Sequence, residues 1–163
     1  MIEGLELWSE FNVAMVGATA ALAGLVIVAS SVNIAEIVKT RSLTARLAAG
    51  IAALVLAIVG SGIGLVPNIS PAWFGILLGF AAVGAGFFQV QATRAIFADH
   101  DPAAQAKLAK SVFGFLPIAA YVAGAVVIAV GHPTGLFLVA TGCILAIVTG
   151  IVVSWVALVE VLR

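Results

Sequence analysis

Residues 13–32 decide the class of fold, because they run VAMVGATAALAGLVIVASSV without a single charge. An α-helix rises about 1.5 Å per residue, so about 20 apolar residues are enough to cross a hydrocarbon core about 30 Å thick. Inside lipid, every backbone N–H and C=O has to be bonded within its own segment, which an open chain achieves only as a helix. The stretch therefore predicts a membrane-spanning helix.

Four further stretches of the same kind follow along the chain. The expected spans are residues 13–32, 47–66, 73–91, 112–130 and 136–159. Of the 163 residues, 64% are hydrophobic and only 9% are charged, whereas a domain that faces water carries about 25% charged residues. We therefore expect an all-α fold, with a single transmembrane domain over residues 1–163 built as an integral membrane bundle of five transmembrane helices.

The connections between the expected spans are of two kinds. Residues 67–71 (PNISP) and 131–134 (GHPT) are short and rich in turn-forming residues, so they predict two antiparallel hairpins. Residues 36–46 and 94–110 are longer and polar, and we expect them to be connections outside the membrane.

All seven cations fall on one side of such a five-span chain. They are Lys39, Arg41, Arg46, Arg94, Lys107, Lys110 and Arg163. Because cytoplasmic loops carry an excess of Lys and Arg, this pattern predicts a cytoplasmic C-terminus and an N-terminus outside. The first ten residues carry three glutamates and no cation, which suits the outer side and lacks the basic start of a secretory signal. Abundant Ala, Gly and Val with few Lys are typical of GC-rich bacteria, so we expect a multi-pass protein of the bacterial cytoplasmic (inner) membrane.

The sequence has none of the patterns on which catalytic, cofactor or metal sites depend. His100 and His132 fall on opposite sides of the membrane, so they do not share a metal ion. The chain has no Gly-rich phosphate loop, no CxxC and no HExxH. The centres of the expected spans contain no Asp, Glu, Lys, Arg or His, which disfavours an ion-coupled transporter. A net charge of zero without a basic stretch disfavours nucleic acid as a partner. We therefore expect a non-enzymatic protein with no cofactor and no metal.

Small residues recur at helical spacing in the first three spans. Gly17 and Gly24 lie seven residues apart, so they share one face of the first span over two turns. Residues 60–64 and 75–79 each begin and end with glycine, which makes a GxxxG pattern in the second and third spans. Small residues let two helix backbones approach closely. These faces predict tight helix packing, either within the chain or between copies of it.

Three more candidate positions for function or packing lie at the ends or in the middle of spans. Asn12 lies at the outer edge of the first span, and Asn33 follows its cytoplasmic end, where a hydrogen-bond network at the helix end is the simpler interpretation. Pro117 lies inside the fourth span, where it removes one backbone hydrogen bond and predicts a kink that is either a hinge or a bend that fits the neighbouring helices.

Two candidates lie at the inner end of the fifth span. Trp155 is placed where amphipathic rings anchor a helix at the membrane interface. Glu160 is closely flanked by apolar residues. It is either a gate or a partner contact, or it forms an interfacial ion pair with a cytoplasmic arginine such as Arg94 or Arg46.

Residues 11–33, the tripeptide Leu-Val-Pro at 65–67 and the C-terminal SWVALVEVLR at 154–163 resemble a family of small, largely uncharacterised bacterial polytopic membrane proteins. Some members of that family are labelled "modulator of FtsH protease". The resemblance spans most of the chain and implies a regulatory partner, a membrane-anchored AAA protease. It also gives more weight to Asn33, Trp155 and Glu160, because these residues lie in the similar stretches.

Three hypotheses for the function follow. The first is a non-enzymatic interaction or regulatory protein that packs with itself or with another membrane protein. The second is a homo-oligomeric channel or permease for a small neutral or lipophilic solute, for which Thr141, Thr149 and Ser154 are the nearest approach to a polar helix face. The third is an accessory subunit that binds membrane lipid or quinone in grooves left by the glycine faces. The missing chemistry and the small-residue faces favour the first.

Overall fold

Five long helices make up the fold, in a computed structural model that describes residues 4–98 and 105–161. The helices are α1 (Ser9–Val32), α3 (Arg41–Ile63), α4 (Pro71–Ala98), α5 (Gln105–Ala129) and α6 (Gly135–Val161). A 3-10 turn, η1 (Leu5–Trp8), precedes α1, and one short helix, α2 (Ile34–Ile37), follows it. Each long helix is long and apolar enough to cross a membrane. Because the described ranges contain no strand, the expected all-α fold with five long apolar helices is confirmed.

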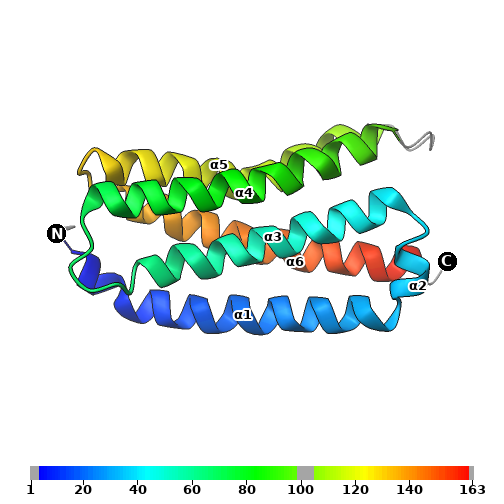
Figure 1. The fold of residues 1–163 in the computed structure, drawn as a ribbon, viewed down its shortest axis with the longest axis horizontal. Helices are drawn as coiled ribbons and strands as arrows, with labels where there is room; N and C mark the ends of the chain where they lie inside the picture. Colours follow the sequence, from blue (N-terminus) through cyan, green and yellow to red (C-terminus); the bar gives the residue numbers. More distant parts are fainter. Residues whose placement is uncertain (1–3, 99–104, 162–163) are drawn as a thin grey trace.

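Helices α3, α4, α5 and α6 form an up-and-down four-helix bundle, and α1 lies along one side of it (Figure 1). Each bundle helix packs against the next one along the chain, and α6 completes the ring by packing against α3. Helix α1 packs mainly against α3 and to a smaller extent against α6. This arrangement follows from apolar helices joined by short connections, which place consecutive helices side by side and antiparallel.

Two turns close the bundle at the end where the N-terminus lies (Figure 1). Asn68, between α3 and α4, has φ 55°, and Gly131, between α5 and α6, has φ 90°, so both turns use the left-handed region. The Ser70 hydroxyl accepts a hydrogen bond from the backbone N–H of Trp73 at 3.3 Å, which caps the start of α4. Pro71 is the first residue of that helix, where a missing N–H costs nothing. The two expected hairpins are therefore present.

The other end of the bundle, called the cationic end below, gathers Lys39, Arg41, Arg46, Arg94 and Lys107. Here the helices extend beyond the expected spans. Helix α3 begins at residue 41 rather than 47, α4 continues to residue 98 rather than ending at 91, and α5 begins at residue 105. Helices therefore occupy much of the described part of residues 36–46 and 94–110, and the expected position of these residues outside the membrane stays a prediction. Arg, Lys, Gln and Ala are good helix formers, so a helix does not end where its apolar run ends.

Helix α3 is the central helix of the molecule. In its most apolar window, 56% of the residues are buried, against 17% for the first span. Its glycines lie at contacts with different neighbours: a Cβ on Gly50 would lie 3.4 Å from Val153 of α6, and a Cβ on Gly60 would lie 2.9 Å from Tyr121 of α5 and 3.2 Å from Leu78 of α4. Since lipid tails are as apolar as leucine, such close packing holds membrane helices together.

Large side chains fill the interior of the four-helix bundle. The main buried cluster is built around Leu56, Phe74, Leu78, Tyr121 and Ile128, each at most 2% exposed. A smaller cluster joins α1 and α2 to α3 and α6 near the cationic end, and it consists of Ala23, Val26, Ile37, Leu43, Leu47, Leu54 and Ala157. The bundle is thus a packed core rather than a wall around a pore.

The two glycines of the GxxxG pattern in α4 differ in their surroundings. A Cβ on Gly75 would lie 2.6 Å from the backbone oxygen of Ala125 and 2.6 Å from the Cβ of Ala129, both on α5. A Cβ on Gly79 would meet nothing within 4 Å. Only the first glycine of the pair therefore mediates a close helix contact.

We predict that Gly75→Ala lowers the free energy of unfolding by about 1–3 kcal/mol, because the added methyl overlaps backbone that has no room to shift. Gly79→Ala is the matched control on the same helix, and it should leave stability unchanged or slightly raised, since alanine is the better helix former. Thermal unfolding of both variants in one detergent checks this. Equal midpoints for the two variants would contradict the close contact between α4 and α5.

Candidate functional site

The outward face of α1 carries the small residues that the sequence singles out. Gly17 and Gly24 are exposed, and a Cβ on either would meet nothing within 4 Å. Ala21 lies between them and is exposed as well. We call this surface, formed by Gly17, Ala21 and Gly24, the α1 small-residue face. It does not supply the helix packing within the chain that was one of the two expectations.

The opposite face of α1 packs against the bundle. Its buried residues are Asn12, Thr19, Ala23 and Val26, spaced at three to seven residues along one side of the helix. The Thr19 hydroxyl donates to the backbone oxygen of Met15 at 2.5 Å, so burying it leaves no unpaired donor. One side of α1 is therefore committed to α3 and α6, while the small-residue face is open.

Asn12 lies where α1 meets the end of α3. It is 6% exposed, and a Cβ on Gly64 would lie 2.5 Å from its Nδ2 and 3.1 Å from its amide carbon. Gly64 therefore leaves the space that the Asn12 amide occupies. This contact makes Asn12 a packing residue between α1 and α3. It also explains why position 64, the second glycine of the 60–64 pair, has no room for a larger residue.

Asn33 ends α1 and separates it from the short helix α2. Its backbone has φ −110° and ψ 19°, outside helical geometry, and its side-chain amide donates to the Ala29 oxygen at 3.5 Å. Nearby, Ser30 donates to the Val26 oxygen at 2.7 Å and Ser31 to the Val28 oxygen at 2.7 Å. Each of these three side chains therefore bonds separately to the backbone of α1, and the bonds do not join into a network.

Trp155 and Glu160 both belong to the last turns of α6 at the cationic end. Trp155 is 69% exposed, so it lies on the surface of the bundle, and its expected role as an interfacial anchor stays a prediction. Glu160 lies within α6, but its side chain is outside the described part of the structure. Its expected ion pair with an arginine therefore stays a prediction.

Pro117 lies inside α5, and the helix continues on both sides of it from Gln105 to Ala129. Its ring is among the most completely buried side chains of the described chain. A buried proline within an unbroken helix fits a position that packs against neighbouring helices.

Most polar side chains of the helices face the protein or bond to their own backbone. Those that are buried are Asn12, Thr19, Ser61, Gln89, Ser111 and Thr149. In α6, Thr141 is exposed and donates to the Phe137 oxygen at 2.8 Å, whereas Thr149 is buried. The threonines of the last span therefore do not share one exposed polar face.

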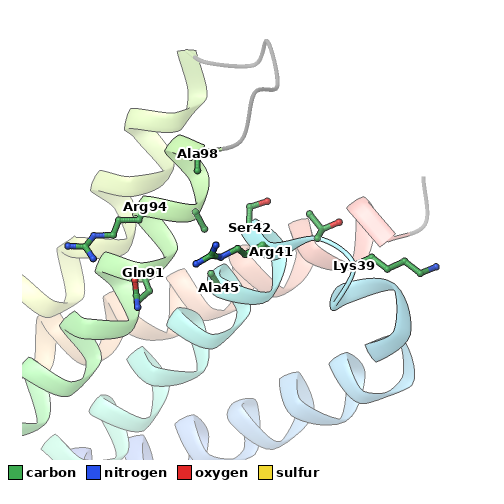
Figure 2. Close-up of a pocket in the computed structure, with 9 residues that line it drawn as sticks. Lys39, Arg41, Ser42, Ala45, Gln91, Arg94 and Ala98 are labelled. Carbon is green, nitrogen blue, oxygen red and sulfur yellow. The ribbon is translucent and has the colours of Figure 1, made fainter.

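The structure also reveals a feature that the sequence did not single out, a cavity at the cationic end between the start of α3 and the end of α4. It has a volume of about 660 Å³, and its lining includes Lys39, Arg41 and Arg94 (Figure 2). Gln91 lines it as well, whereas Gln89 is buried and its amide lies against Gly114 of α5. One feature of the sequence indicates it: residues 91, 95 and 98 are spaced by four and three residues, so they share one helix face, and Arg94 lies beside them. It escaped notice because residues 36–46 and 94–110 were expected to be connections.

Among the described residues, no group of three or more His, Cys, Asp or Glu side chains is placed to hold a metal ion. The single cysteine, Cys143, is fully buried, and its sulfur lies 3.9 Å from the Ser61 hydroxyl. Two surface features of the described chain are open: the α1 small-residue face and the cavity between α3 and α4.

These features define a class, a helical bundle with five helices long and apolar enough to span a membrane. Comparison of the chain with protein-family models, with curated proteins and with solved structures gave no match.

We predict that Gly64→Ala destabilises the fold by about 1–3 kcal/mol, because the new methyl overlaps the Asn12 amide. Adding Asn12→Ala removes the obstructing group and should restore part of the loss. A double-mutant cycle measured by thermal unfolding in detergent checks the coupling. Strictly additive losses would mean that the two residues do not meet as described.

Proposed function

We propose that the chain is a non-enzymatic interaction protein of a membrane, and that it packs through the α1 small-residue face against a helix of a second copy or of another membrane protein. In this proposal the five helices cross a bacterial cytoplasmic membrane, with the N-terminus outside and the cationic end in the cytoplasm. The one-sided distribution of the cations supports that orientation.

The observation that carries the proposal is the open small-residue face on the least buried helix. Gly17, Ala21 and Gly24 line a shallow strip where another backbone can come close, and nothing in the described chain covers it. Close approach is what drives association of helices in lipid. The other face of α1 is already anchored to the bundle, so α1 is held in place to present this strip.

The alternative, a homo-oligomeric channel or permease, finds less support. A pore built by several copies needs a polar stripe on a surface that faces the other copies. The polar side chains of the described spans are mostly buried or bonded to their own backbone, and Thr141 and Thr149 do not share an exposed face.

The resemblance to proteins labelled "modulator of FtsH protease" suggests a particular partner, a membrane-anchored AAA protease. Such an enzyme has transmembrane segments of its own, which the α1 small-residue face could receive. Asn33 and Trp155 lie at the cationic end, on the side where this proposal places the cytoplasm.

We predict that a photo-crosslinking amino acid at Ala21 captures a neighbouring protein in the native membrane, while the same group at Val83 on α4 does not. Gly17→Leu together with Gly24→Leu should reduce the crosslinked product about tenfold, because the larger side chains hold the helices apart; this corresponds to about 1.4 kcal/mol. The mass of the product separates a second copy from a different protein.

Gly79→Leu serves as the control for these variants, since it adds the same side chain at a position where a Cβ has open space, on α4 instead of α1. It should leave the crosslink from Ala21 intact. A crosslink that survives the two α1 substitutions, or that forms equally from Val83, would rule out the α1 small-residue face as the docking surface.

For the orientation, we predict that a membrane-impermeant maleimide applied to intact cells labels Asn68→Cys and not Ala98→Cys. Both variants carry Cys143→Ala, which removes the buried native thiol. Permeabilised cells should label both positions. Labelling of Ala98→Cys alone in intact cells would invert the proposed topology.

A further inference from the structure

A second, apolar cavity lies between the same two helices, next to the cavity at the cationic end. The apolar cavity has a volume of about 570 Å³ and is lined by α3 and α4 residues such as Ala48, Ala52, Gly84 and Phe88. On α3, Ala45 of the first cavity is three residues from Ala48 of the second. One helical turn thus separates the two cavities, which together form a groove along α3 and α4.

The lining of this α3–α4 groove follows one face of each helix. On α4 the lining positions Gly84, Phe88, Gln91, Ala95 and Ala98 alternate in steps of four and three residues. Such spacing keeps side chains on one face of a helix. The groove therefore follows the small and apolar faces of two neighbouring helices along several turns, and it is not a single local packing defect.

The dimensions of the apolar part match one leaflet of a bilayer. Its α3 lining extends from Ala48 to Val59, a distance of eleven residue steps and therefore about 16 Å along the helix axis. Half of a hydrocarbon core about 30 Å thick is about 15 Å. The headgroup and interfacial region adds about 5–8 Å on each side of that core. Arg41 lies seven residues before Ala48, about 10 Å further towards the cationic end, so its long side chain reaches the headgroups by bending back towards the core.

The polar part of the groove is positively charged. Three of its nine lining residues are cations (Lys39, Arg41 and Arg94), and none is acidic. Lys39 is paired with Glu36 at 2.7 Å, whereas neither Arg41 nor Arg94 forms an ion pair with a described residue. Figure 2 shows Arg41 extending from the start of α3 into the space towards α4, while Lys39 and Arg94 point outward on either side.

Two further features favour an anion here. The first turn of α3 lines the cavity through Thr40, Arg41 and Ser42, so the positive end of the helix dipole faces it. No side-chain oxygen of Thr40 caps the helix. Arg94 is exposed, so its side chain is free to turn towards an anion on the fast timescale of surface rotamers.

We propose that the α3–α4 groove binds one anionic phospholipid from the leaflet at the cationic end. Arg41 and Arg94 contact the phosphate, and an acyl chain lies along Ala48, Ala52 and Gly84. This inference rests on the proposed membrane insertion but not on the docking role of α1. A helix of a partner protein would cover the apolar part yet leave the two arginines without a counter-charge, whereas a phospholipid satisfies both parts. Basic pockets between membrane helices are a recurring site for anionic headgroups.

The first test compares lipids added to delipidated protein in a neutral detergent. Phosphatidylglycerol should raise the unfolding temperature more than phosphatidylcholine, because bound ligand stabilises the folded state by mass action. Arg41→Gln and Arg94→Gln should each weaken the apparent affinity for phosphatidylglycerol about fivefold. Lys107→Gln removes the same charge from the cationic end outside the groove and should leave that affinity unchanged. Equal effects of all three substitutions, or equal affinity for both lipids, would overturn the site.

The second test separates a phospholipid from a free phosphate. Glycerol 3-phosphate carries the charge without acyl chains, so it should bind far more weakly than phosphatidylglycerol. Gly84→Leu fills the apolar part and should weaken binding of the phospholipid about fourfold for each acyl CH₂ it displaces. Gly86→Leu, two residues away and also at a position with open space, is the matched control. Equal binding of glycerol 3-phosphate, or no difference between the two leucine variants, would contradict a lipid in the groove.

Discussion

Close approach between helix backbones is the constraint on which this structure depends. In an apolar environment the hydrophobic effect does not hold one helix against another, so packing has to do so. Helix α3 meets this constraint with alanine and glycine on several faces. Gly50 meets α6, Gly60 meets α4 and α5, and Gly64 leaves space for Asn12 of α1. The other helices pack around α3. The positions of the small residues along α3 determine where each neighbouring helix comes close to it.

The same constraint explains what is left uncovered. α1 uses one side for α3 and α6, and its other side carries Gly17 and Gly24 with open space beyond them. α3 and α4 pack closely near the turn that joins them, where Gly60 meets Leu78. Towards the cationic end, alanine and glycine on the two facing sides leave the α3–α4 groove. Small residues thus have two effects in this molecule. Where a neighbouring helix fits against them, the two helices pack closely. Where no helix fits, the small residues leave an open groove or face.

Hydropathy alone was enough to predict the five helices and the two hairpins, because long uncharged runs and the Pro- and Gly-containing turns are local signals. It misjudged where α3, α4 and α5 begin or end at the cationic end, since helices continue into polar sequence that hydropathy assigns to connections. This error in the helix ends also hid the groove between α3 and α4. Half of the α3–α4 groove is lined by the helical extensions that carry Arg41 and Arg94, so a cavity between them could not be anticipated.

The sequence could not predict which glycines contact a neighbouring helix, for a different reason. Gly75 and Gly79 are the two ends of one GxxxG pattern, yet only Gly75 contacts α5. Gly17 and Gly64 are likewise equivalent as sequence features, but Gly64 is buried against Asn12 and Gly17 is open. Which face of a helix meets a neighbour depends on the arrangement of the whole bundle. The pattern identifies helices that can pack closely, and the three-dimensional structure shows which of those faces are still unoccupied.

The central claim is that this chain works by associating with another membrane protein or with itself. Native mass spectrometry of the protein, extracted gently from its own membrane, tests that claim most directly. The account predicts a complex heavier than one chain, whose added mass equals a second copy or an identifiable different protein. A single chain that carries nothing beyond bound lipid, under conditions that preserve known membrane complexes in the same extract, would contradict it.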